Sequence, residues 1–303
     1  MLASGGFLLV LYLGFGLAKP VFLSASNFWT MSQQGSILLL VALGATFVVI
    51  MGMIDLSVGS LVTLGAMVLA ILEPTFHSWA VVPALGATAI VGALNGVLVT
   101  FLRIPSFLVT LGTLSIITGF TLLVGSTYVP INNSFIQNIA ISRVIGSVPI
   151  ITLWAVILTL MLAWLSRYTV FGRSVYAIGG GERVSQIVGM PIRRYKILAF
   201  ALSGLTCGVA GVVLAGITGA GSPNIGSSFL LNAVAAIAIG GTALSGGVGG
   251  VWGTVIGAAI ITVVTSGLTT LQVTEQVQNI VQGSMVIVAV YFTMDRTRGL
   301  IIK

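Results

Sequence analysis

Few side chains in this sequence of 303 residues are placed to do chemistry, and the most informative of them is Asp55. It stands in the run Asp-Leu-Ser-Val between two apolar stretches, each long enough to enter a membrane. A carboxylate at such a depth is costly and by default marks function. Three roles are open for it: a proton relay, a ligand for substrate hydroxyls, or an N-cap that accepts a backbone N–H of the following helix.

Standard arrangements for catalysis and nucleotide binding are missing from the sequence. None of Lys19, Lys196 and Lys303 is followed by Ser or Thr, which excludes a P-loop, and 39 glycines include no GxGxxG. The five acidic residues are scattered, and single residues, His77 and Cys207, cannot form a His-cluster or multi-cysteine metal site. We therefore expect no catalytic residues, no metal and no cofactor in this chain.

The composition places the chain in a membrane. Apolar residues make up 57% and charged residues 6%, with a mean hydropathy of +1.17, whereas a soluble domain carries about 25% charged residues. This excludes a soluble enzyme, a secreted disulfide scaffold and a disordered protein. Because backbone polar groups in hydrocarbon must be satisfied internally, we expect an all-α polytopic membrane protein.

The spacing of charges predicts about ten transmembrane helices, since a span needs roughly 20 mainly apolar residues. The longest uncharged stretch, between Lys196 and Glu275, has room for three. No positive charge precedes the first apolar run, so we interpret it as a retained helix rather than a signal peptide; the missing charge leaves it open whether the native start lies upstream. The expected spans are 2–18, 35–53, 57–72, 80–101, 106–125, 149–165, 197–218, 228–245, 250–268 and 276–293.

The basic residues predict the orientation. Six of the twelve lie in Arg167–Lys196, which makes that segment cytoplasmic, and alternating outward from it puts ten of the twelve inside. Both termini are then cytoplasmic. We expect a single transmembrane domain over 1–303, with a cytoplasmic loop at 166–196 and an outer loop at 126–148 in which Phe135 begins the apolar side of a short surface helix.

Glycine is dense and often repeats at a spacing of four residues, as in Gly92/Gly96 and Gly204/Gly208. Small residues at this spacing let helices approach closely in lipid, so we expect tight helix packing. A short match between Val58–Leu61 and Val248–Val251 suggests two related halves, a design common in transporters.

The cytoplasmic loop contains a segment with the form of a docking helix. It runs from Glu182 to Pro191 after three glycines and predicts about two turns of helix. Val184, Ile187 and Val188 share one face, so they could enter a groove on a cytoplasmic partner. The alternative is a solvated loop that binds no partner and only carries basic residues that set the orientation in the membrane.

Several motifs resemble those of the permease subunits of bacterial ABC sugar importers, the ribose, xylose, galactoside and autoinducer-2 type. The resemblance runs over roughly residues 35–293. One departure is Leu230-Leu-Asn232, where members of that family often carry an acidic residue. The motifs are Gly52–Ser60, Leu94–Gly96, Arg103–Thr113, Gly172–Gly179 with the Glu182–Pro191 segment, and Gly240–Gly247.

This resemblance implies a set of partners and a place for each. A permease dimer, made of identical or different chains, would dock on cytoplasmic ATP-binding subunits in the bacterial inner membrane. A periplasmic or lipid-anchored binding protein would deliver the sugar. The segment that couples to the ATPase would then comprise Glu182, Arg183, Val184, Ile187, Val188, Gly189 and Pro191.

Polar residues within the expected spans are candidates to shape or line the translocation pathway, because hydroxyl and amide groups can bond sugar hydroxyls without the cost of a charge. Bonds between neighbouring helices are the alternative for each. A proton-coupled secondary transporter that uses Asp55 is the rival function, and a structural subunit without transport is the third. The pathway candidates are Asp55, Ser57, Asn95, Thr110, Thr113, Asn232 and Ser245.

Overall fold

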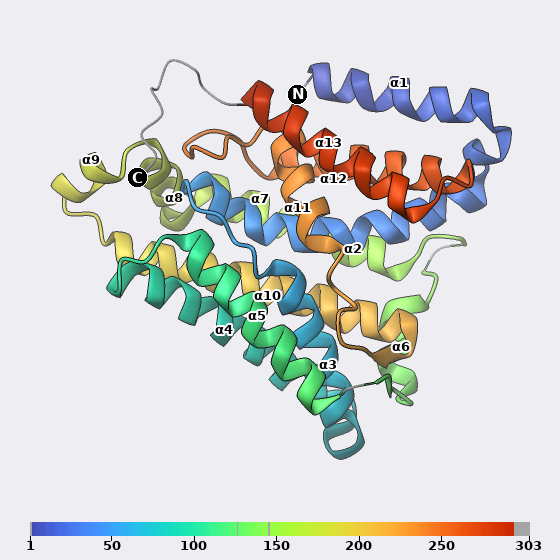
Figure 1. The fold of residues 1–303 in the computed structure, drawn as a ribbon, viewed down its shortest axis with the longest axis horizontal. Coiled ribbons are helices and arrows are strands. Elements are labelled where there is room, and N and C mark those ends of the chain that lie inside the picture. Colours follow the sequence, from blue (N-terminus) through green and yellow to red (C-terminus); the bar gives the residue numbers. More distant parts are fainter. Residues whose placement is uncertain (1, 126, 145, 294–303) are drawn as a thin grey trace.

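The computed structural model describes residues 2–125, 127–144 and 146–293, and most of these are helical. Long helices run side by side through the bundle (Figure 1). Two short strands, β1 (Val129–Pro130) and β2 (Ala220–Gly221), pair antiparallel at one end of it. The prediction of an all-α polytopic membrane protein is confirmed at this level.

Two 3-10 turns, η1 (Pro20–Leu23) and η2 (His77–Ala80), lie in the connections between the helices. In chain order the helices are α1 (Leu2–Ala18), α2 (Ala25–Ile50), α3 (Val58–Phe76), α4 (Val81–Phe101), α5 (Ser106–Val124), α6 (Ser134–Ile141), α7 (Ile150–Tyr168), α8 (Val170–Gly180), α9 (Glu182–Ile187), α10 (Ile192–Thr218), α11 (Phe229–Ile239), α12 (Val251–Thr270) and α13 (Glu275–Thr293).

Six stretches are long and apolar enough to cross a membrane: Ala25–Ile50, Val58–Phe101, Ser106–Val124, Ile150–Tyr168, Ile192–Thr218 and Val251–Thr270. Each of the ten predicted spans also contains a helix, but two of the predicted boundaries are wrong. α2 begins ten residues earlier than predicted, where the Ser24 Oγ accepts a bond from the Asn27 N–H at 3.3 Å. α11 ends at Ile239, and its 11 residues are too few to cross about 30 Å of hydrocarbon.

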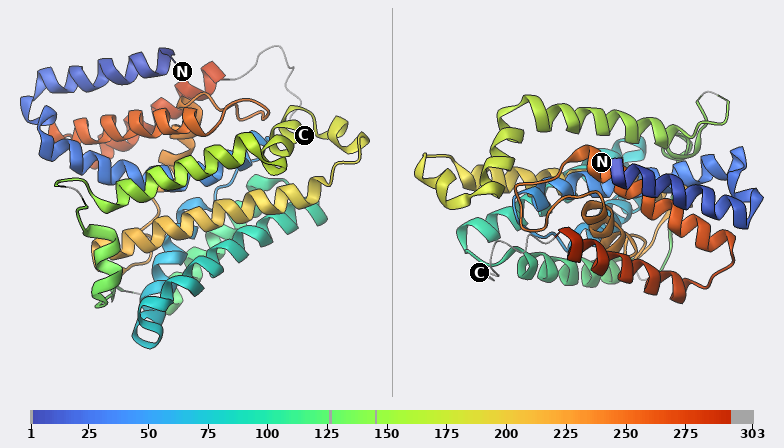
Figure 2. Two further views of the ribbon diagram at one scale, coloured as in Figure 1. Left: turned by 180° about the vertical axis from the view of Figure 1, so that it is seen from behind. Right: turned by 90° about the horizontal axis from the view of Figure 1, so that it is seen from above.

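Four helices form the centre of the bundle among the described residues. α2, α3, α10 and α12 carry most of the buried residues, whereas α4, α5 and α7 lie outside them and expose apolar side chains. Figure 2 shows α4 and α10 running side by side. One end of the bundle carries α9 and the turn between α4 and α5, and the other end carries α6 (Figure 1). α6 confirms the short surface helix predicted around Phe135.

Glycine lets α4 and α10 touch backbone to backbone. A Cβ on Gly92 would overlap the Phe200 carbonyl oxygen and lie 3.2 Å from the Cα of Gly204. A Cβ on Gly204 would in turn overlap the carbonyl oxygen of Thr88. The predicted role of these glycines in close packing is confirmed, because no larger residue fits between the two helices.

We expect Gly92→Ala to lower the free energy of unfolding in detergent by about 1–3 kcal/mol, because the added methyl group forces the helices apart. Thermal unfolding of the purified protein measures this. Gly86→Ala on the same helix is the control, since nothing lies within 4 Å of its Cβ position. Alanine is the better helix former, so the control should be at least as stable as the parent. Equal loss in both variants would contradict the packing role.

Candidate functional site

The chain between α2 and α3 is not helical, although both helices have the composition of membrane spans. Non-helical backbone at membrane depth needs hydrogen-bond partners from the protein. The first turns of α5 supply them: the Ile54 N–H donates to Ser106 Oγ at 3.1 Å, and the Leu56 N–H donates to Thr110 Oγ1 at 3.0 Å. Residues 51–57 are thus held in one shape by side chains of another helix.

Asp55 lies in this segment and is buried, with 3% of its surface exposed. Its Oδ1 accepts from the Ser57 N–H at 3.0 Å and from Ser57 Oγ, and its Oδ2 accepts from Ser203 Oγ on α10 at 2.8 Å. α3 begins at Val58 with Ser57 as its N-cap, so the N-cap role considered for Asp55 is wrong. Its carboxylate closes a turn just before the helix instead.

A chain of hydrogen bonds continues from this carboxylate across the bundle. Asn95 Nδ2 on α4 donates to Ser57 Oγ at 3.0 Å, and Thr113 Oγ1 on α5 donates to Asn95 Oδ1. The chain therefore runs Ser203–Asp55–Ser57–Asn95–Thr113 and joins α10, the 51–57 segment, α4 and α5. We call these five residues the Asp55 network.

The structure brings five of the seven pathway candidates together, because Thr110 braces the same segment that the Asp55 network holds. The other two lie elsewhere. Ser245 is exposed in the glycine-rich turn after α11. Asn232 is on α11, and within the part of the chain that the structure describes its Oδ1 is buried without a hydrogen-bond partner.

Sequence reasoning missed Ser203. It lies 148 residues from Asp55 along the chain, inside an apolar span where a serine hydroxyl ordinarily bonds its own helix. The flanking Gly204 and Gly208, which bring α10 close to its neighbours, were the available signal that this face of the span packs inside the bundle.

A small cavity lies beside Asp55, between α2, α3 and α11. Its volume is about 30 Å³, roughly that of one water molecule in the liquid and too small for a sugar. The side chains around it are otherwise apolar. Its lining comprises Ala45, Val49, Ile54, Asp55, Val58, Ala233, Val234, Ile237 and Leu244.

A larger, polar groove of about 760 Å³ opens at the end of the bundle that carries α9. Residues 52–54, the α4–α5 turn, α9 and the first turns of α10 surround it. Lys196 and Glu182 meet there, with Nζ and Oε1 2.6 Å apart, and this ion pair fastens α9 to α10. Arg193 stacks on the Phe101 ring at 5.1 Å. Ile54 lines both this groove and the small cavity.

The predicted docking helix is present as α9, but it ends at Ile187 rather than near Pro191. Gly189 turns the chain with a φ of +77°, and α10 begins directly after Pro191. Val184, Ile187 and Val188 are 66%, 78% and 71% exposed, although all three are apolar. An apolar face this open at one end of the bundle is available to another protein.

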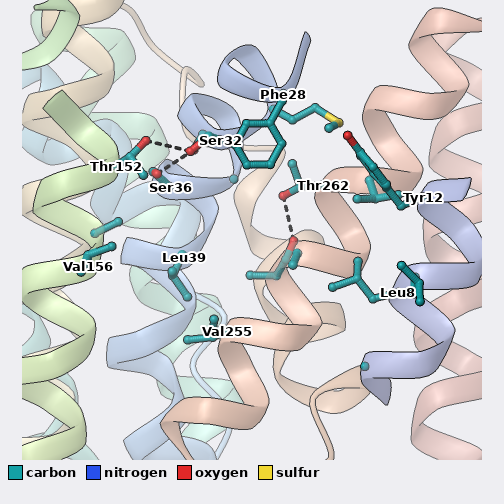
Figure 3. A pocket seen from close by; sticks show the side chains of 18 residues that line it. Leu8, Tyr12, Phe28, Ser32, Ser36, Leu39, Thr152, Val156, Val255 and Thr262 are labelled. Carbon is teal, nitrogen blue, oxygen red and sulfur yellow. Dashed lines mark hydrogen bonds between the residues drawn. The ribbon is translucent and has the colours of Figure 1, made fainter. Parts of the chain in front are cut away.

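A third hollow, shown in Figure 3, is an apolar groove of about 670 Å³ between α1, α2, α7 and α12. Its serine and threonine hydroxyls are already bonded: Ser32 and Thr152 lie 2.8 Å apart, and Thr262 Oγ1 donates to the Ala258 carbonyl at 2.7 Å. Most of the remaining lining is hydrocarbon, which does not suit a polar solute.

Groups of three or more metal-binding side chains are absent from residues 2–125, 127–144 and 146–293. The side chains gathered around Asp55 supply hydroxyl, amide and carboxylate groups.

Comparison with known proteins supplies the family. Residues 27–290 match the branched-chain amino acid transport system / permease component family. The ribose import permease protein RbsC of Escherichia coli K12 is 34% identical over 93% of this chain and 90% of its own length. RbsC of Bacillus subtilis is 34% identical over 97% and 92%, and the D-allose transport system permease protein AlsC of Escherichia coli K12 is 33% identical over 93% and 87%.

No solved structure matches the chain. The match to the family nevertheless extends from the start of α2 to the last turn of α13 and includes the Asp55 network, the polar groove and α9. This chain belongs to the branched-chain amino acid transport system / permease component family.

Proposed function

We propose that the chain is the membrane-spanning permease subunit of an ATP-driven ABC importer that carries a sugar or a related polar small molecule into the cytoplasm. The observation that carries the proposal is similarity over at least nine-tenths of the chain to permeases for ribose and D-allose import. The localisation that goes with this function is the bacterial cytoplasmic membrane.

ATP hydrolysis then belongs to partner subunits, since this sequence lacks a P-loop. The assembly would comprise a cytoplasmic ATP-binding subunit, a periplasmic or lipid-anchored sugar-binding protein and a second permease chain, identical or different. Residues 1–303 would form one transmembrane permease domain with about ten spans, possessing two related halves. Both termini would be cytoplasmic: the described start of α1 and end of α13 face the same end of the bundle as α9 (Figure 1).

α9 is the part of the chain that would bind the ATPase. Its exposed apolar face supports this role, because three adjacent aliphatic side chains in contact with water are unfavourable unless a partner covers them. The Lys196–Glu182 ion pair supports it further, since it ties α9 to a central helix of the bundle. Glu182, Arg183, Val184, Ile187, Val188, Gly189 and Pro191 make up the proposed coupling segment.

We expect Ile187→Asp to abolish copurification of the ATPase in mild detergent, because a charge at the centre of an apolar contact is left desolvated and unpaired. The measurement is a pull-down of the tagged chain with identification of the proteins that come with it. Phe135→Asp on α6 is the matched control, as its side chain is 55% exposed at the opposite end of the bundle. Absence of any ATPase with the unsubstituted chain would count against the importer function itself.

Asn232 is the residue proposed to contact the transported solute. A buried carbonyl oxygen without a donor costs about 1–3 kcal/mol, and a sugar hydroxyl passing α11 would satisfy it. The Asp55 network has a different role in this proposal: its groups bond one another, so they shape the pathway by holding the 51–57 segment. Thr110 shares that role, and Ser245 borders the cytoplasmic end.

We expect Asn232→Ala to lower the uptake rate by about tenfold, the equivalent of one hydrogen bond of about 1.4 kcal/mol to the solute. Its melting temperature should stay the same or rise, because the substitution removes an unpaired buried polar group. Uptake of ribose or allose by the reconstituted complex and thermal unfolding of the same preparation measure the two effects. A fall in stability with no change in uptake would assign Asn232 to packing.

The buried carboxylate of Asp55 favours one rival function, a proton-coupled secondary transporter. That function requires uptake by membranes that contain this chain alone, collapsed by an uncoupler and lost in Asp55→Asn. The importer function requires no uptake without the ATPase, whether Asp55 is present or replaced. Proteoliposomes with and without the partner subunits separate the two.

In the importer we expect Asp55→Ala to destabilise the chain by about 3 kcal/mol or more. Three donors, from Ser57 and Ser203, then lose their acceptor inside the bundle. Unfolding in detergent measures the loss. The control is Glu275→Ala at the exposed start of α13, which should change stability by less than about 1 kcal/mol. Equal stability of both variants would show that the network does not hold the segment.

A further inference from the structure

At the end of α8, Gly179 lies against two separate parts of the chain, backbone to backbone. A Cβ on Gly179 would overlap the Ile50 carbonyl oxygen, the last of α2, and would lie 2.6 Å from the Gly247 backbone nitrogen. Gly247 N–H donates to that same Ile50 carbonyl at 2.7 Å. Three backbones therefore meet at one point, which we call the glycine junction: Gly179, Ile50 and Gly247.

Further contacts hold the junction together on both sides. The Tyr176 hydroxyl, one turn before Gly179 on α8, donates to the Gly249 carbonyl at 3.0 Å. On the other side Gly246 approaches Gly52: a Cβ on Gly246 would lie 2.7 Å from the Gly52 nitrogen. The 240–250 turn thus contacts α8 on one side and the start of the 51–57 segment on the other.

The junction sits between the proposed docking helix and the Asp55 network. On one side only Gly180 and Gly181 separate Gly179 from α9. On the other side Ile50 is the residue before the 51–57 segment, which carries Asp55, and Leu244 of the turn lines the small cavity beside Asp55. Backbone contacts at the junction therefore connect the end of α8, next to α9, with both the 51–57 segment and the turn that contains Leu244.

We propose that the glycine junction transmits the movement of the docking helix to the 51–57 segment, and that Gly179 and Gly247 are positioning residues for ATP-driven transport. Backbone contact without intervening side chains suits this task, since packed elements shift between discrete arrangements and do not deform continuously. The proposal rests on the proposed function, because it takes α9 as the site at which the ATPase acts.

The neighbouring glycine offers a matched control. Gly179 and Gly180 are both helical residues of α8, yet nothing lies within 4 Å of the Cβ position of Gly180. Gly52→Ala disturbs the junction from its other side: its Cβ would lie 3.2 Å from the Ser245 carbonyl oxygen, at a φ of +75° that strains any residue but glycine. Gly179→Ala and Gly180→Ala form the matched pair, one blocked and one open, at nearly one place in the fold.

The experiment is hydrogen–deuterium exchange on the purified permease–ATPase complex, with and without ATP, followed in peptides that cover residues 51–57. The unsubstituted complex should show a several-fold, ATP-dependent change in exchange of this segment. Gly179→Ala should retain the ATPase in the complex but lose most of the ATP-dependent change, whereas Gly180→Ala should keep it. Gly52→Ala should also reduce the change and serves in place of Gly179→Ala where that variant does not fold.

Either of two results overturns the proposal: no response to ATP at residues 51–57 in the unsubstituted complex, or a response in Gly179→Ala equal to that in Gly180→Ala. Failure of the proposed function looks different, because no ATPase then copurifies with the unsubstituted chain. Loss of the ATPase from Gly179→Ala alone also counts against the junction, since the variant should alter transmission and leave docking intact.

Discussion

The constraint on which this structure depends is that every backbone polar group at membrane depth must find a partner within the protein. Where the chain is helical the helix satisfies it. Between α2 and α3 the helix is interrupted, and side chains of α5 bond the Ile54 and Leu56 N–H groups instead. The Asp55 carboxyl group accepts hydrogen bonds from its own segment and from α10. The interruption is therefore held by hydrogen bonds from other helices in place of the bonds of a continuous helix.

Glycine makes these distant groups able to meet. α4 and α10 approach so closely at Gly92 and Gly204 that backbone contacts backbone, and this brings Asn95 and Ser203 near the same turn. Close packing and the polar network are thus one arrangement, since short side chains such as serine reach a partner only where the backbones nearly touch. The same principle recurs at the glycine junction, where contact rather than hydrogen bonding alone joins α8 to the bundle.

Much of the fold could be predicted from the sequence, because a long uncharged stretch in a membrane satisfies its backbone hydrogen bonds by forming a helix. α9 and the candidates Asp55, Ser57, Asn95, Thr110 and Thr113 were also within reach, as polar groups in apolar surroundings stand out. The early end of α11 could not be predicted. Gly240 and the turn after it have a composition compatible with a membrane span, whereas the end of the helix depends on how the turn packs against α8 and α2. Ser203 was missed because its partner is set by tertiary packing, which no local pattern encodes.

The glycine junction also has a genetic consequence. At Gly125 an added methyl group would meet the flexible Met67 side chain, so a smaller residue at position 67 could make room for it. At Gly179 the opposing atoms are the Ile50 carbonyl and the Gly247 nitrogen, which every amino acid possesses. No change of side chain at those two positions can restore the space. A paired replacement can therefore adjust a contact such as that of Gly125 with Met67, whereas at the junction, as at Gly92 and Gly204, only glycine itself or a shift of whole backbone segments keeps the fit.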